Sequence, residues 1–310
     1  MAQTDISLSC FAIVLTLNVI YNLFINKQKK LIKKILIRGI NKKVILITGA
    51  SSGMGKSTAQ DLIEAGHIVY CMARSVDKMK DLEMLGGHVM KMDVTNEENI
   101  DSVVKKIIEE QGRIDVLWNN AGYGLYGPVE ELSMDRVQQQ FKVNVYGVAR
   151  LTQKVLPYMR EKRDGLIINT SSMGGKIYTP LGAWYHASKH AIEGYSDCLR
   201  IELKAFNIKV VVLEPGVIDT GFTQGVRDNF SFESKNGPYK EVVNAYIKAM
   251  DNPPMKGSNP KVISKTVQKI INARKPKTRY VAGQGGKFLI ALRNIFGDRV
   301  YDALMYSQMK

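Results

Sequence analysis

The sequence predicts an α/β fold in which helices cover both faces of a parallel sheet, a doubly wound arrangement. Two observations predict it: short β-branched runs alternate with amphipathic stretches after residue 43, and the first run leads into a glycine-rich turn. A hydrophobic content of 45% suffices for a packed core, and 310 residues suit one large domain or two small ones. We expect a single α/β domain over residues 44–285.

Residues 1–43 differ from the rest of the chain. Residues 6–25 carry no charge, and about 20 such residues span a bilayer as a helix. Asp5 precedes this run and five lysines follow it between residues 27 and 34, the reverse of a cleavable signal peptide. We expect a retained N-terminal membrane helix and a basic linker, with the remainder of the chain on the cytoplasmic side. For residues 29–40 the alternatives are an interfacial helix and a solvated linker.

The net charge of +15 lies at the two ends of the chain. Residues 1–43 carry +7 and residues 254–310 carry +10, whereas residues 44–253 carry −2. This distribution favours an anionic membrane over nucleic acid as a partner; nucleic-acid binding through the ends would instead be strongly salt-sensitive. Cys10, Cys71 and Cys198 fit neither a disulfide framework nor a metal-ligand spacing, so we expect reduced thiols and no metal site.

The first run of the domain, VILIT, continues into TGASSGMG and an amphipathic helix. Glycines at this spacing let backbone N–H groups and the helix N-terminus contact a pyrophosphate. A single glycine motif is weak support, because any tight strand-to-helix turn uses glycine. We expect six residues of this turn to bind a dinucleotide: Gly49, Ser51, Ser52, Gly53, Met54 and Gly55.

The second strand, residues 67–73, ends where such folds bind the adenosine ribose. A site for NAD usually has Asp or Glu there, whereas this chain has Ala73 followed by Arg74. A guanidinium can hold a 2′-phosphate through two parallel hydrogen bonds, so the sequence favours NADP(H). The alternative is an ordinary surface arginine.

Two further strands, HVMKMDVT and IDVLWNNAG, flank a helix expected over residues 96–112, capped by Thr95 or Asn96 and closed by Gly112. In a parallel sheet their ends lie at the same edge as the glycine-rich turn. We therefore expect these strand ends to contribute Asp93, Val94, Asn120, Ala121 and Gly122 to the dinucleotide site.

Tyr185 and Lys189 stand four residues apart in YHASK, at the start of a helix. Side chains at this spacing share a face, so the ammonium can lie near the phenol. A nearby cation favours phenolate and lowers the tyrosine pKa, as an acid/base residue requires.

In this order, TGASSGMG, DVT, NNAG, a serine and YHASK resemble the motifs of the short-chain dehydrogenase/reductase family, over about residues 42–285. Within the family, VYCMARS and VVLEPGVIDTGF resemble 17β-hydroxysteroid and retinol dehydrogenases and acyl-dihydroxyacetone-phosphate reductases. The resemblance implies a Rossmann-type domain with parallel strand order 3-2-1-4-5-6-7. It implies NADP(H)-dependent interconversion of a ketone or aldehyde and an alcohol. A non-catalytic NADP(H)-binding sensor or scaffold is the alternative.

The resemblance also implies roles for individual residues. Tyr185 is the general acid/base, and Ser172, thirteen residues earlier, hydrogen-bonds the substrate oxygen. Asn144 holds a water against Lys189, which also binds the nicotinamide ribose. The catalytic set is thus Asn144, Ser172, Tyr185 and Lys189. Tyr185 and Lys189 are also expected to bind the cofactor. So are four residues at the end of the strand KVVVLEP and after it: Pro215, Gly216, Val217 and Thr220.

Residues 216–241 lack a regular pattern and are expected to form a substrate loop. Aromatic and apolar residues there and before Tyr185 favour a lipophilic substrate, a steroid, retinoid or acyl-chain carbonyl, although they could equally pack only the loop. These residues are Phe222, Phe230, Phe232, Tyr239, Tyr178, Leu181 and Trp184. Residues 286–310 form an amphipathic extension that closes the pocket, meets a second subunit of a homodimer or homotetramer, or contacts the membrane.

Overall fold

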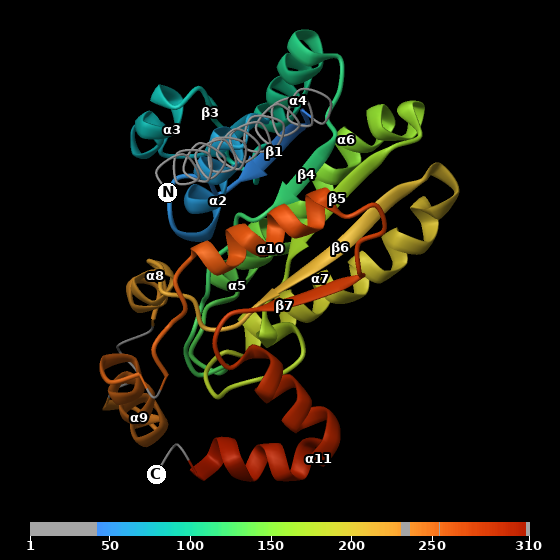
Figure 1. Ribbon diagram of the computed structural model, residues 1–310. Helices are drawn as coiled ribbons and strands as arrows, with labels where there is room; N and C mark the ends of the chain where they lie inside the picture. The colour runs from blue at the N-terminus through green and yellow to red at the C-terminus, as the bar shows by residue number, and fades with distance from the viewer. Residues whose placement is uncertain (1–41, 231–235, 254, 308–310) are drawn as a thin grey trace, which may run out of the picture. The chain divides into compact units, whose positions relative to one another are not determined.

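The computed structural model describes residues 42–230, 236–253 and 255–307 (Figure 1). From Lys43 onward the described chain forms one compact unit. The membrane helix expected near the N-terminus lies outside the described residues. Within them, no helix combines the length and the apolar character needed to cross a membrane.

Seven parallel strands form one sheet in the order β3-β2-β1-β4-β5-β6-β7, which confirms the predicted doubly wound fold and its strand order. The helices and strands alternate along the chain until β6. The strands are β1 (Val44–Thr48), β2 (Ile68–Ala73), β3 (His88–Lys91), β4 (Val116–Asn119), β5 (Gly165–Thr170), β6 (Ile208–Pro215) and β7 (Arg279–Ala282).

The central strand β1 is buried along its whole length, as its unbroken apolar run predicts for a strand covered on both faces. Its side chains alternate between two cores. Ile45 and Ile47 pack with helices α2 (Gly53–Glu64) and α10 (Lys261–Asn272). Val44 and Leu46 pack on the opposite face with the helices α4 (Glu97–Gln111), α6 (Gly147–Lys162) and α7 (Ala183–Glu202) (Figure 1).

The remaining helices are α3 (Lys80–Met84), α5 (Met134–Phe141), α8 (Phe222–Asp228), α9 (Lys240–Asp251) and α11 (Gly286–Ser307). The expected helix over 96–112 is α4: the Asn96 side chain accepts a hydrogen bond from Asn99 N, and Gly112 ends the helix at φ +67°. The sequence predicts an irregular loop over 216–241, but α8 forms inside it because Val226 and Phe230 are buried against the body of the domain.

Candidate active site

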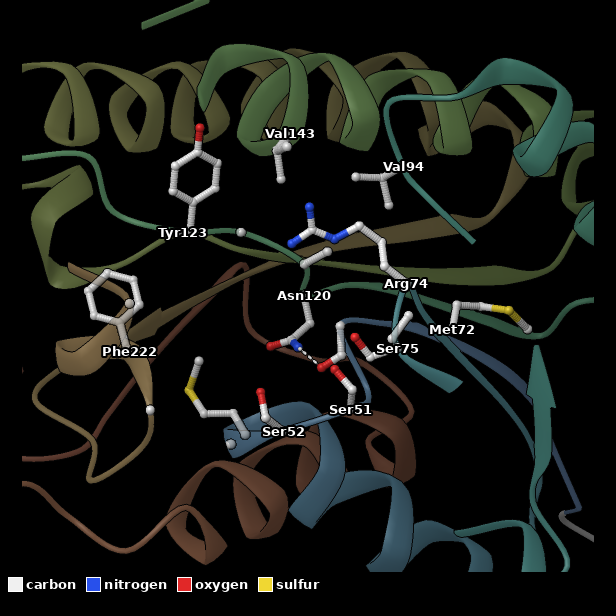
Figure 2. A pocket seen from close by; sticks show the side chains of 18 of the residues that line it. Ser51, Ser52, Met72, Arg74, Ser75, Val94, Asn120, Tyr123, Val143 and Phe222 are labelled. Atoms are coloured by element: carbon white, nitrogen blue, oxygen red, sulfur yellow. Dashed lines mark hydrogen bonds between the residues drawn. The ribbon is translucent and has the colours of Figure 1, made fainter. Parts of the chain in front are cut away.

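Two cavities meet at the carboxyl ends of the strands. The larger, about 580 Å³, runs along the glycine-rich turn and the ends of β2 and β4. The smaller, about 210 Å³, lies over the start of α7. Asn120, Thr220 and Phe222 line both cavities, so the two adjoin. Figure 2 shows the larger one, which we call the cofactor cleft; the smaller is called the reaction cavity.

The glycine-rich turn is shaped by positions that accept only glycine. Gly49 and Gly53 have φ of +70° and +53°, in the left-handed region. A Cβ on Gly55 would lie 2.2 Å from the carbonyl oxygen of Gly49, so this glycine allows α2 to pack closely behind the turn. The N-terminus of α2 therefore faces the cofactor cleft, next to Ser51 and Ser52. The unpaired backbone N–H groups of a helix N-terminus favour the binding of an anion.

Asn120 joins this turn to the end of β4. Its Nδ2 donates to Thr48 O at 3.0 Å, and Thr48 Oγ1 accepts from the backbone N–H groups of Asn120 and Ala121 at 2.9 Å each. Asn120 Oδ1 is buried without a hydrogen-bond partner among the described residues. Because Asn120 lines both cavities, this unused acceptor marks a point where a polar ligand group fits.

The far end of the cofactor cleft is basic. Arg74 and Lys78 line it, and Figure 2 shows the Arg74 side chain extending across the cleft toward Val143 and Tyr123. Among the described lining residues Asp93 is the one acid, and its Oδ1 already accepts from Thr95 N and Thr95 Oγ1 at 2.9 and 2.8 Å. An additional phosphate therefore fits this end better than a bare ribose hydroxyl does.

Tyr185 and Lys189 lie on one face of α7 and both line the reaction cavity. Lys189 Nζ lies 5.9 Å from the centroid of the Tyr185 ring and donates to Thr170 O at 2.9 Å. Burial raises the pKa of Tyr185 to about 12, opposed by a hydrogen bond from Ser172. Burial lowers the pKa of Lys189 to about 8, opposed by the negative charge of Glu193. The sequence predicts that Lys189 lowers the tyrosine pKa; in this structure desolvation raises it instead, and the opposing effect comes from Ser172.

Ser172 follows β5 and begins the turn that lies against α7. Its Oγ accepts from Gly174 N at 3.0 Å. His186, on the first turn of α7, braces the same segment: Nε2 accepts from Thr179 N at 3.0 Å, and Nδ1 lies 2.9 Å from Gly174 O. Since Thr179 N can only donate, the Nδ1 atom of His186 carries the proton and donates to Gly174. Burial lowers the pKa of His186 to about 4, which keeps the ring neutral.

Asn144 lies in a single π-helical turn, Lys142–Tyr146, between α5 and α6. Its Oδ1 accepts from Tyr123 N at 3.1 Å, and its Nδ2 donates to Tyr123 O at 2.9 Å and to Ser188 Oγ at 3.1 Å. A Cβ added to Gly122 would lie 3.1 Å from Asn144 Oδ1 and 3.5 Å from Lys189 Nζ, so both polar groups flank Gly122.

Residues 215–220 lead from β6 to α8, and Thr220 lies against the glycine-rich turn. Gly216 N donates to Ala282 O and Val217 N to Gln284 O, each at 2.8 Å, which fixes this segment along the end of β7. Thr220 reaches the glycine-rich turn: its Cβ would lie 3.2 Å from a Cβ on Gly53. All four residues assigned to this segment, Pro215, Gly216, Val217 and Thr220, line the reaction cavity.

Most residues that the sequence assigns to the site line one of the two cavities. Gly55 and Asn144 line neither cavity. Gly55 packs closely against Gly49, and the side chain of Asn144 is hydrogen-bonded to Tyr123 and Ser188. The structure adds Lys78, Tyr126 and Ile177 as lining residues. The sequence offered a signal for Lys78 that was missed, because Lys78 is a second cation only four residues after Arg74, near the end of β2.

Of the seven aromatic and apolar residues expected at the substrate side, only Phe222 is among the described residues that line the reaction cavity. Trp184 packs against Phe141, and Tyr178 packs against Tyr301 of α11. Leu181, Phe230 and Tyr239 belong to a core cluster under α8 and α9. Phe232 lies outside the described residues.

Aromatic rings nevertheless surround Tyr185. Its ring lies 5.6 Å from those of Tyr126 and Phe222, and Tyr126 stacks on Tyr246 of α9 at 5.5 Å. These rings exclude water from one side of the phenol, which accounts for the desolvation that raises its pKa.

A sequence profile of the family described as short chain dehydrogenase matches residues 43–230. A 3-ketodihydrosphingosine reductase of Bacteroides thetaiotaomicron is 41% identical over 242 residues, covering 78% of this chain and 88% of that protein. An NADPH-dependent 3-dehydrocapnine reductase of Ornithobacterium rhinotracheale is 30% identical over 274 residues, covering 86% and 96%. The crystal structure of a short-chain dehydrogenase from Streptomyces avermitilis superposes with a TM-score of 0.74 at 31% identity, covering 86% of this chain and 95% of that one.

The chain therefore belongs to the short-chain dehydrogenase family of oxidoreductases. The resemblance drawn from its motifs is confirmed.

Proposed function

We propose that this protein is an NADP(H)-dependent oxidoreductase that interconverts a ketone and an alcohol on a lipophilic, acyl-chain substrate. One observation carries the proposal: Ser172, Tyr185 and Lys189 line one cavity that adjoins a cleft with a basic end. The two relatives described above are named as reductases of 3-keto or 3-dehydro compounds, and one is named NADPH-dependent.

The cofactor-binding residues are proposed from the lining of the cleft. The glycine-rich turn and the N-terminus of α2 bind the pyrophosphate, while Arg74 and Lys78 bind the 2′-phosphate. The strand ends at Asp93 and Asn120 hold the adenosine and central parts, and residues 215–220 hold the nicotinamide end. When bound, NADPH supplies the hydride that reduces the carbonyl carbon.

The proton chemistry belongs to the chain itself. With its pKa at about 12, the Tyr185 phenol is protonated at neutral pH and can donate to the carbonyl oxygen. The Ser172 hydroxyl hydrogen-bonds the same oxygen and stabilises the charge that develops there. Lys189, with its pKa at about 8, carries a proton near working pH and can return it to the phenolate.

The apolar walls of the reaction cavity support a lipophilic substrate. Tyr126, Ile177, Ile218 and Phe222 line it beside the polar Tyr185 and Ser172. Such a cavity accepts a carbonyl at one wall and an alkyl chain along the others. Because two relatives are named as reductases of 3-keto and 3-dehydro compounds, we favour a long-chain 3-ketone over a steroid or retinoid.

An assay of NADPH oxidation over a panel of ketones tests the proposal. Long-chain 3-ketones should support oxidation, and short hydrophilic ketones should support at least about tenfold less, because they bury less apolar surface. The competing function, a non-catalytic sensor or scaffold, predicts tight NADPH binding without oxidation on any member of the panel. That result would reject the enzyme.

We also propose that residues 1–43 anchor the protein to a membrane with the domain on the cytoplasmic side, on the charge asymmetry of the sequence alone. Fusion of these residues to a soluble reporter tests this proposal. The reporter should sediment with membranes after cell fractionation, and recovery of the fusion in the soluble fraction would contradict it.

A further inference from the structure

A pair of buried glutamates lies next to the elements that hold Lys189. Glu193 is on α7, one helical turn after Lys189, and is 4% exposed. Glu214, near the end of β6, is 2% exposed. It follows Leu213, which pairs with Thr170, and the Thr170 carbonyl accepts the hydrogen bond from Lys189. The charge of this pair is therefore felt at the Lys189 ammonium.

The surrounding cations contact the two glutamates unequally. Glu193 Oε2 lies 3.0 Å from Lys176 Nζ and 3.0 Å from Arg279 Nε. Glu214 Oε1 lies 3.5 Å from Arg279 Nε and makes no hydrogen bond to it. Because nearby cations favour the ionised form, Glu214 retains a proton more readily than Glu193 does. The other titratable groups around the pair are on α7 and α11: Lys189, His190, Asp197, Arg293 and Asp298.

The hydrogen bonding of the pair is incomplete unless one member is protonated. The Oε1 atoms of Glu193 and Glu214 are buried without a hydrogen-bond partner among the described residues. Two ionised carboxylates can only accept hydrogen bonds, so neither could satisfy the other. A proton on Glu214 makes its carboxyl group a donor to Glu193, and the two side chains are placed for that hydrogen bond. Burial and the charge of Glu193 accordingly raise the pKa of Glu214 to about 7.

We propose that Glu214 donates a proton to Glu193 near neutral pH, and that loss of this proton to water holds Lys189 in its charged form as the pH rises. In this step the O–H bond of Glu214 breaks, water takes the proton, and a second negative charge remains beside Glu193. Glu193 also lines an open cavity of about 430 Å³, through which water reaches the pair. Both glutamates act through Lys189, so they are positioning residues. The proposal rests on the proposed function, which gives Lys189 its role.

Lys189 needs such a partner because burial lowers its pKa to about 8. A neutral lysine has no proton to return to the Tyr185 phenolate. The negative charge of Glu193 already opposes the effect of burial on Lys189, and an ionised Glu214 adds to it in a region where water screens charges weakly. Glu214 loses its proton at a lower pH than Lys189 does, so the second charge is present when Lys189 begins to titrate.

The pH dependence of kcat in Glu214→Gln tests the proposal, with saturating NADPH and a long-chain 3-ketone. Gln keeps a neutral donor toward Glu193 but cannot ionise. Near pH 6 the variant and the wild type should have kcat and KM for NADPH within about twofold of each other. On the alkaline side, the pH at which kcat is halved should be lower in Glu214→Gln by at least about 0.5 unit, because Lys189 lacks the second charge.

Asp197→Asn is the matched control. Asp197 is a carboxylate of α7 that also pairs with Arg279, but it lies two helical turns from Lys189 and its side chain is 38% exposed. Its alkaline midpoint should stay within about 0.2 unit of the wild type, because water screens an exposed charge. An unchanged alkaline midpoint in Glu214→Gln, or an equal shift in Asp197→Asn, overturns the proposal.

Infrared spectroscopy gives a readout that does not depend on turnover. The C=O stretching band of a protonated carboxyl group should be present in the wild type near pH 6, weaken by about pH 8.5, and be missing from Glu214→Gln at both values. If no ketone is reduced, the proposed enzyme fails, and the band still shows whether Glu214 holds the proton. Identical carboxyl bands in the wild type and Glu214→Gln near pH 6 would overturn the proposal even in an active enzyme.

Discussion

At the scale of single residues, we propose that Arg74 and Lys78, which line the cofactor cleft, determine the preference for NADPH over NADH. Arg74→Glu should raise the KM for NADPH by at least about 100-fold and change the KM for NADH by less than about threefold, because a carboxylate repels the 2′-phosphate but not a hydroxyl. Lys78→Glu should act in the same direction. Lys80→Glu is the control, since Lys80 is highly exposed and does not line the cleft. Equal effects of Arg74→Glu on both cofactors would contradict the assignment.

Alanine substitutions at two glycines test whether the glycine is needed for close packing, as at Gly55, or only adds backbone freedom, as at Gly194. Gly55→Ala should destabilise the fold by at least about 2 kcal/mol and weaken NADPH binding, because the new Cβ would overlap the Gly49 carbonyl. Gly194→Ala should instead stabilise by roughly 0.5–1 kcal/mol, because Gly194 lies inside α7 with open space around it. Urea unfolding measures both. A neutral Gly55→Ala would show that the turn is not held as described.

The positions of several site residues could be predicted from the sequence alone. The spacing of Tyr185 and Lys189 placed both on one helical face, and the glycine spacing placed the turn at the end of β1. The tyrosine pKa could not be predicted, because its desolvation comes from Tyr126 and Phe222, which are 59 and 37 residues away in the chain. Long-range packing of this kind leaves no local pattern.

At the scale of elements, α7 holds the turn that carries Ser172. His186 does so as a neutral ring, and its pKa of about 4 makes that brace pH-dependent. The unfolded chain protonates this histidine near pH 6.5 and the folded chain only near pH 4. The unfolded state therefore binds more protons between these values, and stability is lost as the pH falls through the window.

Urea unfolding at pH 7 and at pH 4.5 measures this effect. The wild type should lose up to about 3 kcal/mol relative to His186→Gln over that interval. The comparison with the variant is needed because of Glu214. Burial and the nearby Glu193 raise the pKa of Glu214 to about 7, so its protonation increases the stability of both proteins as the pH falls. His190→Gln should track the wild type. Identical pH dependence of wild type and His186→Gln would refute the role of this brace.

The elements themselves were predicted unevenly. Strands β1, β2, β4, β5 and β6 carry apolar runs, whereas β3 is short and half-exposed; α4 has both a capping asparagine and a terminal glycine. The stretch 216–241 reads as irregular because Gly, Asn and Ser interrupt its periodicity, yet α8 forms there. Contact with residues of the distant α9 stabilises it, including the Arg227–Asp251 ion pair at 2.6 Å.

At the scale of the whole molecule, the parallel sheet brings the ends of strands β1 to β6 and the start of α7 to one edge, where the cleft and the reaction cavity meet. The residues that line the two cavities range from position 49 to position 229, so no short segment contains the site. For the proposed reaction, the Tyr185 hydroxyl must deliver the proton while the rest of this edge binds the dinucleotide.

Parallel measurement of NADPH affinity and turnover in Tyr185→Phe tests that requirement most directly. NADPH should bind with a Kd within about threefold of the wild type, and turnover should fall by at least about 100-fold, because the phenol proton is lost while the ring remains. Tyr158→Phe, a half-exposed tyrosine away from both cavities, should preserve both quantities. Turnover of Tyr185→Phe near the wild-type rate would contradict the account.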